Sequence, residues 1–279
     1  MKYCRFVFEG EIEYGAVEER GGELWIVDLI DAPEEDLAFH LARSRAGALV
    51  ADPAGFDFEP LPLNAASLLA PVTPSKIVCV GRNYRDHAKE LGNEVPAEPL
   101  LFWKPASSLL APGGVVRMPA ASARVDFEGE LALVIGKRVS RLKAEDDWRG
   151  AIRGYTLAND VTARDLQKKE GQWTRAKGWD TFCPVGPLVS DEVDAAAGLT
   201  IETHVNGELR QHGSTADFIF SIPELLVYIT QAITLEPGDL ILTGTPAGVG
   251  SLAAGDRVDV SLAGIGAGLG VLSNTFQAE

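Results

Sequence analysis

Two glutamates, Glu128 and Glu130, lie two positions apart in the mainly apolar run at residues 125–135. If this run forms a strand, alternate residues share a face, so both carboxylates point one way and their apolar neighbours point the other. Adjacent carboxylates repel each other, and a divalent cation would offset that repulsion. The alternative is a solvated strand face, which we expect for the identical Glu-Gly-Glu sequence at residues 9–11.

A third carboxylate, Asp160, stands where a strand pattern at residues 154–159 gives way to a helical pattern. Arg164 and Gln167 follow four and seven residues later, so all three side chains would share one helical face. The alternative for Asp160 is a helix N-cap, a common role at such a junction. Three oxygen ligands without a histidine or cysteine cluster favour Mg²⁺ or Mn²⁺ over Zn²⁺.

A histidine and a glutamate, His87 and Glu90, follow the β-branched run at residues 77–80. In one helical turn residues three apart are neighbours, so the carboxylate can hold one tautomer of the imidazole and make it a better base. The alternative for the same spacing is a surface ion pair. No comparable carboxylate lies close in sequence to the other histidines, which are His40, His204 and His212.

Lys177 lies between two aromatic residues, Trp173 and Trp179. A lysine that aromatic rings partly desolvate could hold a substrate carboxylate, although an isolated lysine is more often a solvated surface residue. The glycine-rich segment at residues 237–250 contains Thr245 and lacks the Gly-Lys-Ser/Thr ending of a phosphate loop. Its backbone N–H groups and the threonine hydroxyl could still contact an anion.

Two familiar catalytic signatures do not fit the chain. The glycines at residues 264–270 loosely resemble a dinucleotide fingerprint, but too few residues follow them for the helix and second strand of that motif. The sequence also has no Gly-x-Ser-x-Gly motif, which disfavours a serine hydrolase.

These candidate residues must be positioned by a fold that the patterns after residue 71 indicate to be rich in β-strands. Short strand candidates at residues 77–80, 125–135, 154–159, 200–205 and 240–243 are separated by Gly/Pro turns. One helix is well marked, because Ser221 and Glu224 form a capping-box pattern and apolar residues then recur at helical spacing to Ile233. We therefore expect a sandwich or barrel rather than alternating βαβ units.

The first seventy residues differ in charge from the rest of the chain. They contain 5 basic and 14 acidic residues, whereas the 279-residue chain as a whole has 25 basic and 40 acidic residues. Together with the punctuation at residues 71–74, this predicts a small N-terminal α+β domain at 1–70 and a larger domain at 71–279. Within the small domain we expect strands near 3–8, 11–17 and 23–29, a helix near 34–47, and a proline-rich linker.

Composition excludes several classes of protein. The formal net charge of −15 argues against a nucleic-acid binder and against a partner on an anionic membrane surface. No apolar run approaches the length of a membrane span, and the N-terminus does not resemble a secretory signal. Three cysteines far apart in sequence are most simply reduced thiols, so we expect a cytoplasmic protein.

Six motifs, taken in order, give the region at 71–279 a resemblance to the fumarylacetoacetate hydrolase superfamily, in its 2-hydroxyhepta-2,4-diene-1,7-dioate isomerase and acylpyruvase-like branch. They are G-R-N-Y-x-D-H-x-x-E, the E-G-E strand, A-N-D-V-T-A-R-D-x-Q, A-K-x-x-D-T-F-C-P-x-G-P, V-N-G-E-x-x-Q and P-G-D-x-I-x-T-G-T-P-x-G-V-G. The resemblance implies a mostly β fold with some α, namely a mixed β-sandwich roll resembling a barrel, usually in a homodimer.

The resemblance also implies roles for individual residues. Mg²⁺, or Mn²⁺, would be held by Glu128, Glu130 and Asp160. His87 and Glu90 would form a catalytic dyad on a segment that orders over substrate, with Lys177 as a further catalytic group. Substrate contacts would come from Arg82, Tyr84, Arg164, Gln167, Lys177 and Thr245. One departure is visible, since many relatives have Lys-Ser-Phe where this chain has Lys177-Gly178-Trp179, and this departure affects the expected shape of the pocket.

The implied substrates are small 2-oxo acids, often dicarboxylates, whose enolate the metal would stabilise. We expect first an isomerase-like tautomerase or decarboxylase of the 2-hydroxyhepta-2,4-diene-1,7-dioate type. The alternatives are an acylpyruvate C–C hydrolase, an oxaloacetate decarboxylase or tautomerase, and, from another class, a non-catalytic protein that binds 2-oxo acids. The dyad does not separate these reactions.

Overall fold

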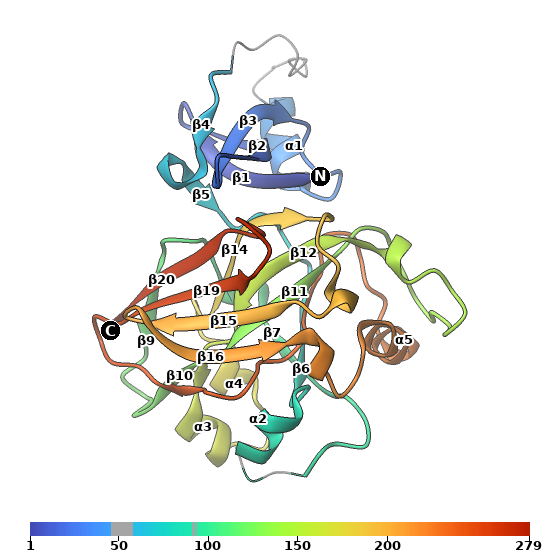
Figure 1. The fold of residues 1–279 in the computed structure, drawn as a ribbon, viewed down its shortest axis with the longest axis vertical. Helices are drawn as coiled ribbons and strands as arrows, with labels where there is room; N and C mark the ends of the chain where they lie inside the picture. The colour runs from blue at the N-terminus through green and yellow to red at the C-terminus, as the bar shows by residue number, and fades with distance from the viewer. Residues whose placement is uncertain (46–57, 91, 93) are drawn as a thin grey trace.

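The computed structural model describes residues 1–45, 58–90, 92 and 94–279. It is mostly β, with three sheets and a few short helices (Figure 1). The largest sheet has twelve strands, and ten of them follow one another in the order β4-β3-β2-β1-β14-β12-β11-β17-β6-β7. The expected mostly β fold with some α is confirmed, as an open arrangement of sheets rather than a closed barrel.

The strands of the largest sheet are β1 (Lys2–Phe8), β2 (Glu11–Arg20), β3 (Glu23–Ile30), β4 (Leu61–Pro62), β5 (Ser67–Leu69), β6 (Ile77–Gly81), β7 (Leu100–Lys104), β8 (Leu109–Leu110), β11 (Gly129–Ile135), β12 (Ile152–Asn159), β14 (Cys183–Ser190) and β17 (Leu240–Leu242). A five-stranded sheet contains β16 (Glu208–Ser214), β15 (Thr200–Val205), β19 (Arg257–Ala263), β20 (Val271–Ala278) and β9 (Val115–Met118). A three-stranded sheet contains β13 (Thr162–Ala163), β10 (Val125–Phe127) and β18 (Gly250–Ser251).

The α-helices of the described residues are α1 (Leu37–Arg45), α2 (Arg85–Glu90), α3 (Arg164–Lys169), α4 (Thr174–Lys177) and α5 (Ile222–Ala232). Short 3₁₀ helices cover Leu63–Ala65, Ala106–Ser108, Arg149–Ala151, Ala195–Ala197 and Thr215–Asp217. In Figure 1, α2, α3 and α4 gather at the end of the molecule opposite the N-terminal strands. Among all the described residues, no helix is both long enough and apolar enough to cross a membrane.

The N-terminal strands lie close to their predicted positions, and the helix begins later than expected. It begins at Leu37 rather than near residue 34, and it is described to Arg45. Residues 46 and 47 of the predicted helix, and much of the predicted proline-rich linker, fall outside the described residues. The three cysteines are free and buried, as the expectation of reduced thiols requires.

The N-terminal segment does not form a separate sheet. β1 pairs antiparallel with β14, with Lys2 opposite Ser190 and Tyr3 opposite Val189. The division into two domains at residue 71 therefore stays a prediction. The largest sheet contains strands from both sides of this position.

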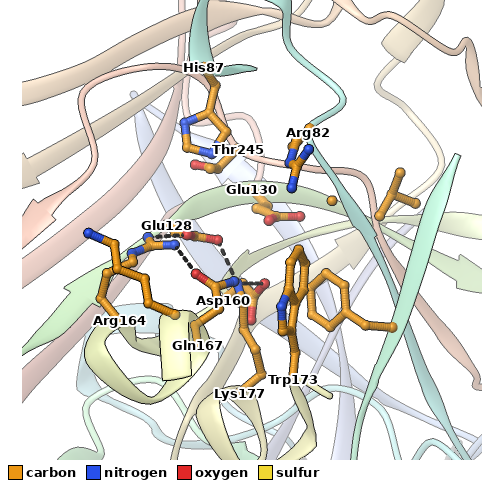
Figure 2. A pocket seen from close by; sticks show the side chains of 14 residues that line it. Arg82, His87, Glu128, Glu130, Asp160, Arg164, Gln167, Trp173, Lys177 and Thr245 are labelled. Carbon is orange, nitrogen blue, oxygen red and sulfur yellow. Dashed lines mark hydrogen bonds and ion pairs between the residues drawn. The ribbon is translucent and has the colours of Figure 1, made fainter. Parts of the chain in front are cut away.

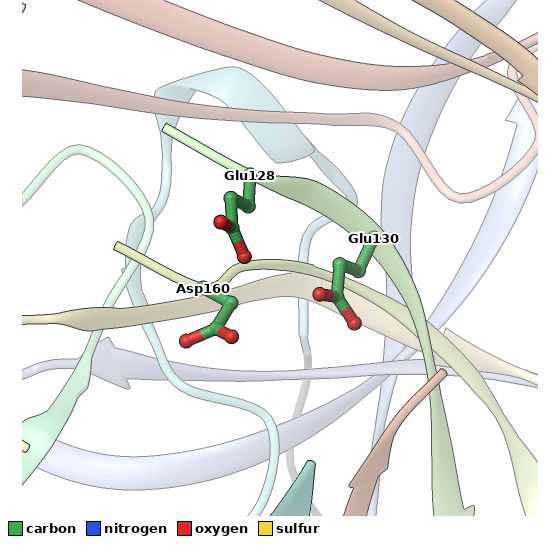
Figure 3. Close-up of side chains that lie close together, drawn as sticks. All are labelled: Glu128, Glu130 and Asp160. Atoms are coloured by element: carbon green, nitrogen blue, oxygen red, sulfur yellow. The ribbon is translucent and has the colours of Figure 1, made fainter. Parts of the chain in front are cut away.

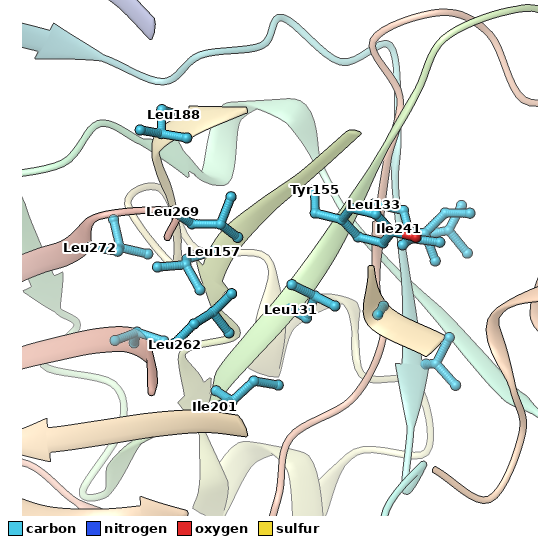
Figure 4. Packing of buried hydrophobic residues seen from close by; sticks show 14 of the residues in the cluster. Leu131, Leu133, Tyr155, Leu157, Leu188, Ile201, Ile241, Leu262, Leu269 and Leu272 are labelled. Carbon is cyan, nitrogen blue, oxygen red and sulfur yellow. The ribbon is translucent and has the colours of Figure 1, made fainter. Parts of the chain in front are cut away.

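Two hydrophobic clusters lie on opposite faces of the central strands. Odd-numbered residues of β11 and β12 pack with residues of the five-stranded sheet such as Ile201 and Leu262, which makes a sandwich (Figure 4). The buried residues of α5 belong to the same cluster. Even-numbered residues such as Ala132, Val134 and Ala158 belong to the second cluster, on the other face. The alternation expected for residues 125–135 is confirmed, with apolar residues on both faces. The single strand expected there is wrong, because the run divides at Glu128 into β10 and β11, which belong to different sheets.

The predicted helix near residue 222 is confirmed as α5. The capping box is complete, because the Ser221 backbone N–H donates to Glu224 at 2.7 Å and proline stands in the first turn. Its buried face includes Leu225, Leu226 and Ile229, at helical spacing. This face closes one side of the first cluster.

The glycine between Glu128 and Glu130 has a packing role. A Cβ atom on Gly129 would lie 2.0 Å from Thr203 Oγ1 and 3.2 Å from Val260 Cγ1, in the five-stranded sheet. We expect Gly129→Ala to lower the free energy of unfolding by about 2 kcal/mol or more, since overpacking a buried site forces backbone shifts. Urea unfolding measures this loss, and equal stability of the variant would contradict the close approach.

Candidate active site

A cavity of about 320 Å³ opens at the end of β11 and β12, between these strands and α2, α3 and α4 (Figure 2). Its lining combines acidic, basic and aromatic side chains. These are Val80, Gly81, Arg82, His87, Phe102, Glu128, Glu130, Asp160, Arg164, Gln167, Lys168, Trp173, Lys177 and Thr245. Most of the residues that the sequence predicted for the site therefore meet in one pocket.

Three carboxylates form the floor of this pocket (Figure 3). Glu128, Glu130 and Asp160 are all buried, and each offers one oxygen atom within 4.8 Å of the other two. The alternative of a solvated strand face is wrong for Glu128 and Glu130. The identical sequence at residues 9–11 is exposed as expected, but it lies at the turn between β1 and β2 rather than on a strand face.

The β-ladder between β11 and β12 brings Asp160 to the glutamates. Gly129 pairs with Asn159, so the next position along the ladder sets Glu128 opposite Asp160, and the Asp160 N–H donates to the Glu128 carbonyl at 2.8 Å. The Asn159 side chain accepts the N–H of Glu128 at 2.9 Å, which fixes this corner further. Glu130 lies two positions along the same strand, on the same face.

The predicted helical relation among Asp160, Arg164 and Gln167 is wrong. Helix α3 begins only at Arg164, and its N-cap is Ala163, so Asp160 neither lies on the helix nor caps it. Residues 162–163 form β13 instead and turn the chain before the helix starts. The three side chains still line the same pocket, because the turn brings α3 alongside the end of β12.

Two cations bridge the carboxylates. Lys177 Nζ donates to Glu128 Oε2 at 2.7 Å and also to Asp160 Oδ2. Arg164 donates to Glu128 Oε1 through Nη2, to Asp126 Oδ2 through Nε at 2.9 Å, and to Gln167 Oε1 through Nη1 at 2.7 Å. Protein groups accept from three of the five N–H donors of this guanidinium and use each of its nitrogens, so the structure supports a positioning role for Arg164 more than a direct substrate contact.

A second buried lysine, Lys104, was missed at the level of sequence. It lies at the end of β7 and donates to Asp160 Oδ1 at 2.7 Å and to the carbonyl of Val161 at 3.1 Å. Its side chain is fully buried. The burial of a lysine at the end of an apolar strand is hard to predict from sequence, because such lysines usually point to solvent.

Asp126 was also missed, although strand alternation could have found it, because it shares a face with Glu128 and Glu130. It is fully buried and accepts from Arg164 as well as from Arg124, at 2.8 and 3.0 Å. It therefore anchors the arginine that in turn holds Glu128.

The carboxylates differ in how their charge is compensated. Burial favours the protonated acid, but Lys177 and Arg164 outweigh it and hold the pKa of Glu128 below its ordinary value. Burial and the nearby charges of Asp160 and Glu128 raise the pKa of Glu130 well above its ordinary value. Among the described residues Glu130 forms no ion pair, and it accepts one hydrogen bond, from Gly244 N–H at 2.6 Å.

These donors fit a divalent cation. Mg²⁺ bonds oxygen at about 2.0–2.1 Å, so two of its ligands lie at most roughly 4.2 Å apart. The carboxylate oxygens lie within 4.8 Å of one another, so modest side-chain movements would let all three carboxylates reach one ion. The raised pKa of Glu130 reflects a buried negative charge without a compensating cation, which a metal would supply. Oxygen-only donors suit Mg²⁺ or Mn²⁺, and the thiols nearby are no competitors, since burial raises the pKa of Cys183 to about 12.

The His87–Glu90 pair lies opposite the acidic floor. His87 is buried on α2, and its Nδ1 lies 3.2 Å from Glu90 Oε2. In a neutral ring this contact places the proton on Nδ1 and leaves Nε2 as the basic nitrogen. Glu90 itself is held by the N–H of Gly248 at 3.1 and 3.2 Å. Figure 2 shows the ring of His87 across the pocket from Glu128 and Asp160. A simple surface ion pair does not describe this buried histidine.

The remaining predicted residues divide between the pocket and its supports. Thr245 lines the pocket, donates to the carbonyl of Gly129 at 2.8 Å, and accepts from Gln211 at 2.7 Å. Gln167 lines the pocket with its side-chain carbonyl held by Arg164, and its NH₂ group has no acceptor among the described residues. Arg82 lines it with φ of +60° and forms no ion pair among the described residues.

The prediction that Tyr84 contacts substrate is corrected by its position. Its ring packs edge-on against Phe218, with centroids 5.0 Å apart, and it lines a different cavity on the other side of α2. The departure at Gly178-Trp179 has less effect than expected, because neither residue is among those that line the active pocket. The aromatic wall is formed instead by Trp173 and Phe102, whose rings lie 5.2 Å apart.

Fold and site together define a class of protein: a β-sandwich with a buried carboxylate trio facing a histidine–carboxylate pair. Residues 76–277 match the family model described as fumarylacetoacetate (FAA) hydrolase C-terminal. The chain belongs to the fumarylacetoacetate hydrolase family.

Three relatives illustrate this membership. Protein MJ1656 of Methanocaldococcus jannaschii is 51% identical over 195 residues, which cover 70% of this chain and 81% of that protein. Oxaloacetate tautomerase YisK of Bacillus subtilis is 44% identical over 218 residues, which cover 73% of this chain and 72% of that protein. The crystal structure of 2-hydroxyhepta-2,4-diene-1,7-dioate isomerase from Mycobacterium marinum is 38% identical, with a TM-score of 0.81 and coverage of 100% and 99% of the two chains.

Proposed function

We propose that this protein is a divalent-metal-dependent tautomerase of small 2-oxo dicarboxylic acids, of the 2-hydroxyhepta-2,4-diene-1,7-dioate isomerase or oxaloacetate tautomerase kind. The observation that carries the proposal is the placement of a buried carboxylate trio opposite one imidazole, in a cavity of about 320 Å³. The names of two relatives, an oxaloacetate tautomerase and a dienoate isomerase, support this type of reaction.

The metal site would consist of Glu128, Glu130 and Asp160. A divalent cation bound there would supply Lewis-acid stabilisation for negative charge that develops on the oxygen of a 2-oxo acid. Neighbouring side chains hold the carboxylates in place, since Arg164 orients Glu128 and Lys104 orients Asp160 through the hydrogen bonds described above.

His87 would move the proton. With Nδ1–H directed at Glu90, Nε2 faces the pocket and can take a proton from one carbon or oxygen of the substrate and return it to another. The cavity where the substrate oxygens would lie is lined by the Gln167 amide, the Thr245 hydroxyl and the Arg82 guanidinium. Trp173 and Phe102 shield one side of the pocket from water.

The test is an assay of metal-stripped protein with Mg²⁺, with Mn²⁺ and with EDTA. Enol-to-keto conversion of oxaloacetate and of a 2-hydroxymuconate-type dienoate is followed by the loss of enol absorbance. We expect conversion with metal and none above the uncatalysed rate with EDTA. Metal-independent conversion, or no conversion at saturating metal, would contradict the proposal.

The same samples test the alternative functions. Release of pyruvate from oxaloacetate would identify a decarboxylase, and cleavage of acetylpyruvate to two acids would identify a C–C hydrolase. Binding of oxalate without turnover of any of these compounds would favour the non-catalytic binding protein.

A smaller effect is expected at Glu90. Replacing it with glutamine keeps an oxygen that can accept the Gly248 N–H but removes the charge that orients and supports His87. We expect Glu90→Gln to lower kcat by about tenfold to a hundredfold with little change in KM. Steady-state kinetics on the best substrate measure this, and an unchanged kcat would mean that the carboxylate only anchors α2.

A further inference from the structure

We propose that the ammonium group of Lys177 is a built-in counter-ion of the metal-free site, which a metal ion must displace. Lys177 would then weaken metal binding, and it would become available to a substrate anion only after the metal has entered. This inference rests on the metal site of the proposed function and adds an order of events within it.

The contacts of the carboxylate oxygens carry the argument. Lys177 Nζ donates hydrogen bonds to Oε2 of Glu128 and Oδ2 of Asp160, while Arg164 donates to the other oxygen of Glu128. Lys104 donates to the other oxygen of Asp160. Every oxygen of these two carboxylates is therefore engaged by a cationic side chain, and Lys177 is the one that joins them (Figure 2).

Glu130 is different, because it forms no ion pair in the described part of the chain. One of its oxygens accepts the N–H of Gly244 at 2.6 Å. An entering cation therefore meets one uncompensated carboxylate, and it must share the oxygens of Glu128 and Asp160 with Lys177 or displace the ammonium.

Sharing is unfavourable for two positive charges. The ligand oxygens of the trio lie within 4.8 Å of one another, and a metal bonded to them would lie in the space that the ammonium group borders. Two cations a few ångströms apart among buried side chains repel each other strongly, because protein screens charges less well than bulk water does. Metal entry should therefore drive Nζ away from at least one of its carboxylate partners.

The displaced ammonium has a place to go within the pocket. Lys177 Nζ already lies 4.9 Å from the centroid of the Phe102 ring, and Trp173 packs against that ring. An aromatic face stabilises a cation at this range, so Nζ can move along the wall and stay in the cavity. There it faces the space where a 2-oxo acid would bind.

Lys104 supplies the matched comparison. Both lysines are buried and both donate to Asp160, but Lys104 donates to Oδ1, the oxygen that Lys177 does not bind, and to the carbonyl of Val161. Its removal relieves some repulsion of a metal and at the same time releases the orientation of Asp160. These two effects oppose each other, so the metal affinity of a Lys104 variant should change little.

The experiment measures metal binding and needs no substrate. Wild-type protein and the variants Lys177→Met and Lys104→Met are stripped with EDTA, dialysed and titrated calorimetrically with MnCl₂ and MgCl₂. Lys177→Gln, which keeps N–H donors for the carboxylates, replaces the methionine variant if circular dichroism shows that the latter is unfolded. We expect loss of the Lys177 charge to lower Kd at least tenfold, which corresponds to about 1.4 kcal/mol, and Lys104→Met to change it by less than about threefold.

An unchanged or weaker affinity in the folded Lys177 variant would overturn the inference, since the lysine would then only support the ligands. An equal gain in both lysine variants would also overturn it, because net charge alone would explain the result. If wild-type protein binds metal normally while either of these outcomes holds, the proposed function stands without the displacement. If wild-type protein binds neither ion, the proposed function and the inference both fail.

Discussion

Replacing Glu130 with glutamine should remove metal-dependent turnover, with a fall of about 10³-fold or more, while leaving the metal-free protein at least as stable as the wild type. Of the three proposed metal ligands, Glu130 is the one that has no ion-pair partner among the described residues. The negative charge of Glu130 would help to bind a metal ion, but without a metal the burial of that charge destabilises the folded protein. Glutamine has the same shape and can still accept the Gly244 N–H through its carbonyl oxygen, so the variant removes little besides the charge.

The pH dependence of stability follows from the same residue. Burial and the neighbouring acids raise the pKa of Glu130 in the folded protein, so between the unfolded pKa, about 4.3, and the folded pKa the native state binds more protons than the unfolded state. The free energy of unfolding of the metal-free wild type should therefore fall as pH rises through that window. In Glu130→Gln this contribution is absent, and the variant should be more stable by about 1 kcal/mol or more at neutral pH. Urea unfolding in EDTA from pH 5 to pH 8 measures both.

The chain offers its own control for this experiment. Glu11 belongs to the identical Glu-Gly-Glu sequence at residues 9–11, where it is exposed. Glu11→Gln should change neither turnover nor the pH slope. If Glu130→Gln keeps metal-dependent activity, or if metal-free wild type gains stability as pH rises through the same window, Glu130 is not the uncompensated ligand.

Replacing His87 with alanine should lower kcat by about 10²- to 10⁴-fold and leave metal affinity within about threefold of the wild type. The imidazole lines the pocket opposite the carboxylates, and its Nδ1 is held by Glu90 at 3.2 Å, so only Nε2 is available to move a proton. None of its hydrogen bonds involves the carboxylate trio. Turnover and calorimetric titration with Mn²⁺ on the same preparation separate the two effects.

The matched control is the other histidine–glutamate contact. His212 Nδ1 lies 3.1 Å from Glu202 Oε1, nearly the same distance, but the His212 side chain is 62% exposed and lies outside the active pocket. His212→Ala should leave kcat and metal affinity unchanged. Equal losses in both variants, or normal turnover in His87→Ala, would remove His87 from the reaction.

The carboxylate trio could be anticipated from sequence because its geometry is mostly local. Alternation along one strand is enough to set Glu128 beside Glu130, and the six motifs together indicated the family. The expectation that Asp160 stands where a strand ends was correct, but the helical face that it was expected to share with Arg164 and Gln167 was wrong. The position of Asp160 comes from the ladder between β11 and β12, and strand pairing between distant segments cannot be deduced from a periodicity.

The groups that sequence reasoning missed are those whose role depends on burial. Lys104 and Asp126 are ordinary charged residues in sequence, and only the fold shows that both are enclosed and paired. Asp126 could still have been found, because it shares the face of Glu128. The prediction for Tyr84 was wrong in the opposite way, since this residue lies in a strong motif but lines a different cavity.

The second hydrophobic cluster joins parts of the molecule that motif matching separates. Tyr3, Tyr14 and Phe39, from the first seventy residues, belong to the same buried cluster as Ala132 and Ala158, on the two strands that bear the carboxylates. A chain shortened to the matched region would expose the backs of these strands, together with the edge of β14 that β1 covers. The N-terminal segment and the active site should therefore lose their structure in one cooperative transition on heating, and the start of the family match at residue 76 is not a boundary for unfolding.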